Sequence, residues 1–343
     1  WIGGFLQGKY TKDKINLYGM GGLSSIKYSY QDHFTVANEV VNADAISTFQ
    51  VKGGIMYDVD DNVSVFANTG YVEKPPIMDN VIYYDGTVAS DPLNESFISS
   101  EAGVNFESEK FAVKVSAYNT DWKDRNLTKA VTTGQGDSGD TDVIFLKGIG
   151  QKHQGLEVEG SMKLNDMVRL GGAVSFGKWK FDGDADGLYT EYAEDAPIQT
   201  AYTYTLDGLY VGDQPQTAYV LGTTLTPMDG LRLQGIFKMY DKNYADWSPD
   251  SRELSGDADR SQVWQAPGYN RLDLHASYKL PKVAGYDMTL TGHLFNALDA
   301  VYVQDAVDNS QYNGFGDKLH LAHNAEVFLG TPRYFNLGLT VNF

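Results

Sequence analysis

The final stretch, residues 331–343, constrains the fold of this chain more than any other part of the sequence. From Phe335 onward every second residue is apolar, and Asn, Gly and Thr fill the positions between them. A period of two is typical of a β-strand with one apolar and one polar face. Such a strand, preceded by a long polar loop, fits one strand of a barrel that crosses a membrane. The alternating apolar residues are Phe335, Leu337, Leu339, Val341 and Phe343.

The composition limits how the chain could cross a membrane and what it could bind. No apolar run approaches the roughly 18 residues that a transmembrane helix needs, so any span must be built from strands. The formal net charge of -18 argues against a nucleic-acid partner, because phosphate binding needs clustered Lys and Arg. The absence of Cys excludes a disulfide scaffold and a Cys-ligated zinc site. The chain opens on Trp1 inside a strand pattern without a signal peptide, so we expect an upstream part.

Along the chain, strand patterns alternate with short turns and long polar loops, and no helical periodicity stands out. The pattern predicts about 13 sequential antiparallel strands. Every second connection is short, so the short turns share one end of the sheet and the long loops share the other. The predicted strands span residues 1–10, 15–30, 45–58, 62–73, 97–107, 110–122, 153–164, 167–181, 216–226, 231–240, 269–280, 288–298 and 331–343.

Two faces can be separated within these strands. In residues 110–122, Val113 and Val115 alternate with Lys114 and Ser116, which predicts an apolar face toward hydrocarbon and a polar face toward water. The alternative is a soluble antiparallel sheet with one buried face. That arrangement would need an apolar cover as large as the sheet itself.

Several segments carry a family resemblance, in the order that the family uses. They are NTGYVEKPPI (68–77), FISSEAGVNF (97–106), KVSAYNTDWKDR (114–125), QGLEVEGSM (154–162), GHLFNALDAVYV (292–303) and the ending 333–343. In these segments the chain resembles the C-terminal half to two-thirds of the barrel of a TonB-dependent outer-membrane receptor. The resemblance implies an all-β transmembrane antiparallel barrel, with about 13 of 22 strands in residues 1–343 and the plug domain outside this chain.

The resemblance also implies partners and a location. They are the bacterial outer membrane and its lipid bilayer, and the TonB-ExbB-ExbD energy-coupling complex acting through the missing N-terminal part. The terminal Phe343 looks like the signal that such barrels present to the barrel assembly machinery.

The implied function is import of a scarce solute, with a ferric siderophore or a similar chelate as the first candidate. Three alternatives stay open: an oligosaccharide or peptide importer of the same family, a passive porin or adhesin barrel, and a soluble acidic β protein that binds or cleaves glycans. No G-x-S-x-G, H-E-x-x-H or P-loop motif is present, so neither an enzyme nor catalytic residues are predicted.

Aromatic residues at strand ends and in long loops are the candidates for contact with a small-molecule ligand. Flat rings can stack on a sugar or chelate, although an interfacial aromatic girdle explains the same enrichment. The candidates are Trp122, Trp179 and Tyr240, which have inward parity, and Tyr202, Tyr204, Tyr244 and Trp247 in the loops.

One acidic motif suggests a cation. In DGDADG, Asp182, Asp184 and Asp186 alternate and Gly residues allow a sharp turn, as in oxygen-ligated calcium loops. The bidentate Glu expected at the twelfth position is replaced by Ala193, and a solvated acidic loop is the alternative. No other cofactor is predicted. His320 and His323 share a loop and are expected to be a solvated pair.

Overall fold

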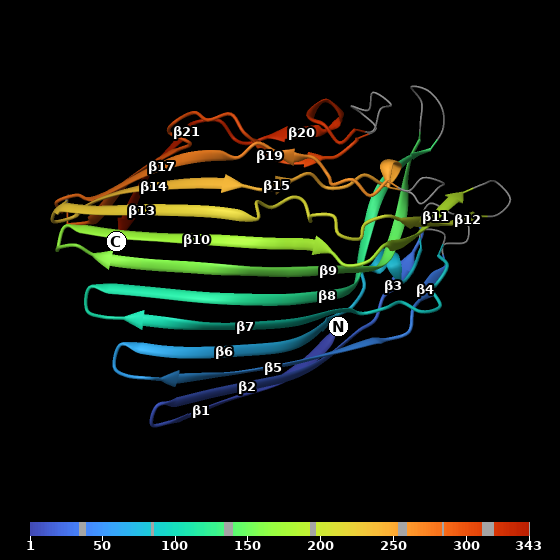
Figure 1. The fold of residues 1–343 in the computed structure, drawn as a ribbon, viewed down its shortest axis with the longest axis horizontal. Helices are drawn as coiled ribbons and strands as arrows, with labels where there is room; N and C mark the ends of the chain where they lie inside the picture. Colours follow the sequence, from blue (N-terminus) through green and yellow to red (C-terminus); the bar gives the residue numbers. More distant parts are fainter. Residues whose placement is uncertain are drawn as a thin grey trace.

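The chain forms one antiparallel sheet in which each strand pairs with the next strand of the wall (Figure 1). The computed structural model describes residues 1–33, 39–83, 86–133, 140–192, 197–252, 259–282, 285–310 and 319–342. Thirteen strands follow one another in a single line, and β11 and β12, which lie off that line, complete a 15-stranded sheet. The predicted number and order of the wall strands are therefore confirmed.

The wall strands agree closely with the alternation in the sequence. The short hairpins lie at one end of the wall, on the left in Figure 1, and the longer connections lie at the other end. We call the latter the long-loop end. The wall consists of β1 (Ile2–Lys12), β2 (Ile15–Ile26), β5 (Ile46–Asp58), β6 (Val63–Lys74), β7 (Glu95–Glu107), β8 (Phe111–Thr133), β9 (Asp140–Lys163), β10 (Val168–Phe181), β13 (Thr217–Met228), β14 (Leu231–Asp241), β17 (Tyr269–Lys279), β18 (Asp287–Phe295) and β21 (Tyr334–Asn342).

The long-loop end contains more regular structure than the sequence predicts. β8 and β9 extend into the segment between residues 123 and 152, and β11 (Ala185–Tyr192) and β12 (Pro197–Tyr204) form a hairpin in residues 182–215. Register shifts between Trp122 and Arg125, and between Arg125 and Leu127, interrupt the alternation in β8. A β-bulge moves following side chains to the opposite face, which explains why the extension reads as a loop.

Small elements occupy the remaining connections. Within the described ranges, no helix is long and apolar enough to cross a membrane. The small elements are β3 (Ser29–Gln31), β4 (Val40–Asn42), η1 (Met78–Asn80), β15 (Asn243–Tyr244), η2 (Pro249–Ser251), β16 (Gln265–Ala266), β19 (Val303–Val307), η3 (Ala322–Asn324) and β20 (Glu326–Leu329).

The register separates an outer, apolar face from an inner, polar face. Val115 lies opposite Val104 and Val158, and these three share the outer face. A hollow of about 750 Å³ on this face, lined by Leu233, Leu274 and other apolar side chains, faces the side that a barrel presents to hydrocarbon. It is therefore not a solute site.

Charged residues on the inner face neutralise one another across strands. Lys114 Nζ lies 3.1 Å from Glu101 and 4.0 Å from Glu159, and Lys238 Nζ lies 2.9 Å from Asp273. These charges need water or another polar surface, because hydrocarbon would leave them unsolvated.

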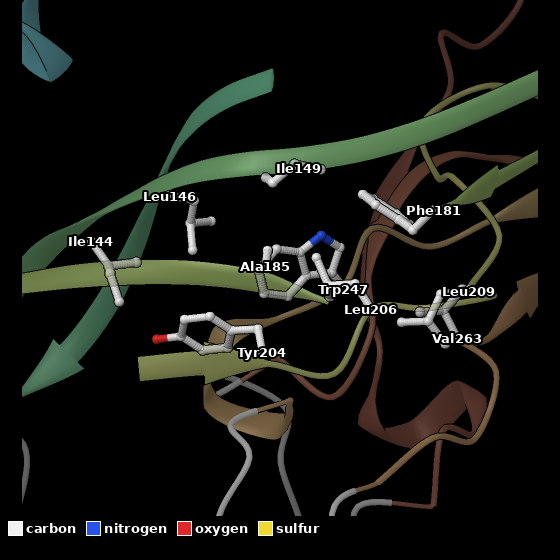
Figure 2. Close-up of a cluster of buried hydrophobic side chains, with 10 residues drawn as sticks. All are labelled: Ile144, Leu146, Ile149, Phe181, Ala185, Tyr204, Leu206, Leu209, Trp247 and Val263. Carbon is white, nitrogen blue, oxygen red and sulfur yellow. The ribbon is translucent and has the colours of Figure 1, made fainter. Parts of the chain in front are cut away.

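A compact apolar core lies at the long-loop end rather than within the wall. It joins the extended part of β9 to the segments that follow β10, β12 and β14 (Figure 2). We call this cluster the loop core. A smaller cluster of Ala43, Val81 and Ile82 lies in the loops before β7. The loop core consists of Ile144, Leu146, Ile149, Phe181, Ala185, Tyr204, Leu206, Leu209, Trp247 and Val263.

Candidate functional site

The structure brings two of the predicted aromatic residues into one row. Trp122 on β8 and Trp179 on β10 lie on either side of His153 on β9. Ring centroids are 6.5 Å apart between Trp122 and His153 and 5.4 Å apart between His153 and Trp179. Phe97 on β7 adds a fourth ring, 4.6 Å from Trp122. We call these four residues the inner aromatic row; all are half-buried, so part of each ring remains open.

Polar contacts hold the two indoles of this row in place. Trp122 Nε1 donates to Glu95 at 3.2 Å, and Trp179 Nε1 donates to the Tyr118 hydroxyl at 2.9 Å. The Glu95 side chain is buried and accepts a charged hydrogen bond from Lys74 at 3.2 Å. Partners fixed in this way restrict the rotation of the rings, so the row offers a pre-organised surface.

A cation flanks the row. The Arg125 guanidinium lies 4.4 Å from the centre of the Trp122 ring, within the range of a cation–π contact. Arg125 follows the first bulge of β8, which places it beside the ring rather than on the next inward position. The row therefore combines flat apolar surface with one positive group, a combination that suits a planar or anionic ligand.

Tyr240 belongs to a separate stack on β14 and β17. Its ring lies 5.1 Å from Tyr269, which stacks on Tyr302 at 4.3 Å. Arg271 donates to the Tyr302 hydroxyl at 3.0 Å, and Tyr302 is buried. The sequence identified Tyr240 but missed Tyr302, which reaches the stack from the connection after β18.

Two predicted ligand contacts are structural in this fold. Tyr204 and Trp247 are only 4% and 1% exposed and pack together in the loop core, with ring centroids 5.5 Å apart (Figure 2). Tyr202 lies beside them, 6.5 Å from Tyr204. Because the rings of Tyr204 and Trp247 are enclosed by other side chains, they join two loops and present no face to a solute.

Tyr244 lies in a stack that the sequence did not reveal. Its ring is parallel to Tyr210 at 4.2 Å, and Lys180 Nζ lies 4.5 Å from the Tyr210 ring. Burial and the neighbouring Tyr210 raise the pKa of Tyr244 to about 12. Tyr244 therefore stays neutral at physiological pH.

The predicted calcium motif is engaged by protein groups. Both carboxylate oxygens of Asp184 accept from Arg260, at 3.0 and 2.8 Å, and this contact lowers the pKa of Asp184. Asp186 accepts from the Thr203 hydroxyl at 2.9 Å. Among the described residues, no three His, Cys, Asp or Glu side chains gather as a metal site. Calcium binding by Asp182, Asp184 and Asp186 stays a prediction that the geometry does not favour.

A charged cluster around His320 replaces the expected solvated pair. His320 lies 2.5 Å from Asp308 through Nδ1 and 2.5 Å from Asp259 through Nε2. Arg252 Nη2 lies 3.4 Å from Asp308, and both of these side chains are fully buried. We call these four residues the loop latch, because they tie the connection before β17 to the connection before β21. The latch forms only where two loops that are distant in sequence meet, so it could not be predicted from any local sequence pattern.

Acidic groups accumulate beside the latch. Burial and the nearby carboxylates of Asp246 and Asp305 raise the pKa of Asp213 to about 7. Lys129, from the extension of β8, pairs with Asp246. The described loops at this end thus contain at least one carboxyl group that titrates near neutrality.

Solved structures with the same fold are considerably longer than this chain. The Copper transporter OprC superposes with a TM-score of 0.63 at 14% identity, over 98% of this chain and 46% of that chain. The FrpB iron transporter from Neisseria meningitidis (F3-3 variant) gives 0.59 at 15%, over 98% and 44%. The ferric-catecholate import receptor Fiu from E. coli K12 gives 0.57 at 14%, over 96% and 42%.

These identities establish a shared fold and nothing finer. The chain spans less than half the length of each of these structures. None of the curated proteins is a detectable sequence relative. A family model described as TonB dependent receptor-like, beta-barrel matches residues 2–297, and the chain belongs to this family.

Proposed function

We propose that residues 1–343 are the C-terminal portion of the barrel of a TonB-dependent importer in the bacterial outer membrane. The wall ends in β1 and β21, and in the described part of the chain each of these strands pairs on one side only. Open strand edges are unfavourable in hydrocarbon, so further strands supplied by the receptor, to a total of about 22, would close the barrel. The plug domain and the contact with TonB-ExbB-ExbD would lie outside this chain. Phe343, the proposed assembly signal, lies outside the described residues.

The proposed substrate is a ferric siderophore or a similar metal chelate. The inner aromatic row carries this proposal, because its open ring faces and the adjacent Arg125 suit a flat chelate with negative charge. The structural neighbours are a copper transporter, an iron transporter and a ferric-catecholate import receptor, which supports a metal-containing substrate. A soluble glycan-binding protein is no longer a competing function, because the chain belongs to a receptor-barrel family.

Substitution of the indoles in the full-length receptor tests this function. Trp122→Ala and Trp179→Ala should each weaken chelate binding roughly tenfold or more, as loss of a hot-spot aromatic does. Phe176→Ala is the matched control: it removes a ring from the same strand as Trp179, but from the outer face. Binding is measured on purified receptor, and uptake is measured in cells with and without an uncoupler.

The same experiment distinguishes the alternatives. Uptake that persists with the uncoupler would identify a passive pore. An oligosaccharide or peptide that competes at the indoles, in a receptor that does not bind any ferric chelate, would assign the row to those substrates instead. Equal losses from Phe176→Ala and Trp179→Ala would exclude the inner aromatic row as the binding surface.

A further inference from the structure

Two histidines face each other on the inner wall, away from the inner aromatic row. His275 on β17 and His293 on β18 are directly opposed in register, and their Nδ1 atoms are 2.9 Å apart. The register continues to Gln234 on β14 and to Asn336 on β21. Four adjacent strands thus place two imidazoles between two amides at one height of the wall.

The space in front of this pair is open. A hollow of about 430 Å³ is lined by Arg232, Gln234, both histidines and Phe295. The Phe295 ring is 5.5 Å from His275 and 6.0 Å from His293. Both imidazoles are half-buried, so a small ion could reach them from the lumen.

Neighbouring charges do not occupy the pair. The nearest acidic residue on β17, Asp273, accepts from Lys238 Nζ at 2.9 Å and from the backbone N–H of Asn296 at 2.9 Å. Arg271 lies 3.6 Å from the same carboxylate. Asp273 is therefore neutralised by its own partners, and the imidazole nitrogens remain directed at each other.

We propose that His275 and His293 form a binding site for a late divalent transition-metal ion, with Cu²⁺ as the best fit. Imidazole nitrogen is a preferred ligand of these ions. Two nitrogens at about 2.0 Å from a metal lie roughly 2.8–2.9 Å apart in adjacent square-planar positions, and roughly 3.3 Å apart in a tetrahedron. The observed separation is that of a hydrogen bond and is close to the square-planar value, so Cu²⁺ and Ni²⁺, which adopt that arrangement, require less movement of the rings than Zn²⁺.

Binding requires a local proton movement and a rotation of the two rings. Without metal, one Nδ1 donates its proton to the other, so the two nitrogens point at each other; with metal both rings turn until the two Nδ1 lone pairs converge on the ion. The displaced proton moves to Nε2 of the same ring, so each imidazole stays neutral. Because no third His, Cys, Asp or Glu among the described residues joins the pair, water and the amide oxygens of Gln234 and Asn336 would complete the coordination. Such a site exchanges its ion readily, which suits a position along a transport route.

The test is a titration of the full-length receptor in detergent with CuSO₄, followed by electron paramagnetic resonance and calorimetry. Wild type should bind one Cu²⁺ with hyperfine coupling to nitrogen. His275→Ala and His293→Ala should each weaken binding roughly tenfold or more, and the double variant should lose the nitrogen-coupled signal. Ni²⁺ should bind more weakly than Cu²⁺, in line with the order of stability for these ions.

His33→Ala is the control, because it removes an exposed histidine from the connection after β3, outside both the wall and the inner aromatic row. It should leave Cu²⁺ binding unchanged. Heat-modifiable migration on gels verifies that each variant is folded. The proposal is overturned if folded wild type shows no nitrogen-coupled Cu²⁺, or if the double variant retains the wild-type signal. Ferric-chelate uptake is a separate readout, so failure of this site leaves the proposed import function to its own test.

Discussion

At the scale of single residues, the face of the wall on which a residue lies determines whether a polar or an apolar side chain is tolerated there. Val115 on β8 lies in the same cross-strand row as Val158 and Val174, on the outer face. Ala173, one residue from Val174, points to the inner face and lies opposite Glu159. Val115 and Ala173 therefore lie at nearly the same depth in the wall but face opposite sides of it.

This pair allows a matched test of the face assignment. Val115→Lys should destabilise the folded receptor in lipid by about 2–4 kcal/mol, because the ammonium group meets hydrocarbon. Ala173→Lys should cost far less, since its ammonium meets water and Glu159. Urea unfolding in liposomes measures both, and equal losses at the two positions would show that the faces are misassigned.

Trp247 is predicted from the sequence to contact a ligand, but in the structure it is buried in the loop core. The sequence marks it as a loop aromatic, but its burial depends on Tyr204, Leu206 and Val263, which come from other segments. Trp247→Ala should leave a cavity and destabilise the loop core by about 3–5 kcal/mol. Limited proteolysis should then cut the loops while the wall stays intact.

Trp247→Phe is the informative companion variant. It keeps most of the ring and removes an indole N–H that has no hydrogen-bond partner among the described residues. It should therefore lose much less stability than Trp247→Ala. Loops that stay resistant to protease in Trp247→Ala would show that the core does not hold them.

At the scale of elements, the long-loop end is held together by contacts between connections rather than by the strands. The loop latch is the charged part of this assembly, and its state depends on pH. Burial lowers the pKa of His320, but the hydrogen bonds that its ring donates to Asp308 and Asp259 outweigh burial and raise the pKa above its usual value. Burial raises the pKa of Asp259, but the bond to His320 and other contacts lower it overall.

The signs of these shifts define a pH window for the latch. A raised pKa means that the contribution of His320 is complete below its unfolded pKa of about 6.5 and is lost as pH rises through the folded value. The contribution of Asp259 is lost only in acid, as pH falls through its lowered pKa. Neutral His320 has one N–H for two carboxylates, so the latch should weaken on the alkaline side.

Hydrogen exchange around Arg252 and His320 measures this effect. Protection should fall as pH rises above the folded pKa of His320, after correction for the intrinsic exchange rate. His320→Gln, which cannot carry charge, should exchange faster at low pH and show no such step. His33→Gln, at an exposed histidine in a different loop, should behave like wild type. A step that survives in His320→Gln would assign the titration to another group.

The elements also show why the strands of the wall could be predicted from the sequence and the structure of the long-loop end could not. Strands such as β21 have an apolar residue at every second position, so their two faces could be predicted from the sequence. The β8 bulges break that alternation, and the β11–β12 hairpin pairs with β9 through residues far away in sequence. Sites built across loops, such as Asp184 with Arg260, depend on contacts that have no period and could not be predicted.

At the scale of the whole molecule, the outer edges of β1 and β21 dominate, because neither edge pairs with another strand of the described residues. Unpaired backbone groups cost several kcal/mol each in hydrocarbon, so the chain expressed alone should not insert as a stable monomer. The complete receptor should give a folded band that resists SDS until heated. A monodisperse, protease-resistant monomer of residues 1–343 in liposomes would contradict the proposal that this chain is one portion of a larger barrel.

The sequential order of the wall has a further consequence for how such proteins can diversify. Each wall strand pairs with its neighbour in the wall. In a hairpin, the length and type of the turn fix the register of the two strands. A residue inserted in a short turn would shift a whole strand by one position and exchange its two faces. At the opposite end, doubling the length of a loop costs only about 0.6 kcal/mol. Insertions and deletions as well as substitutions can therefore accumulate at the long-loop end during evolution. In the wall strands, only substitutions preserve the register.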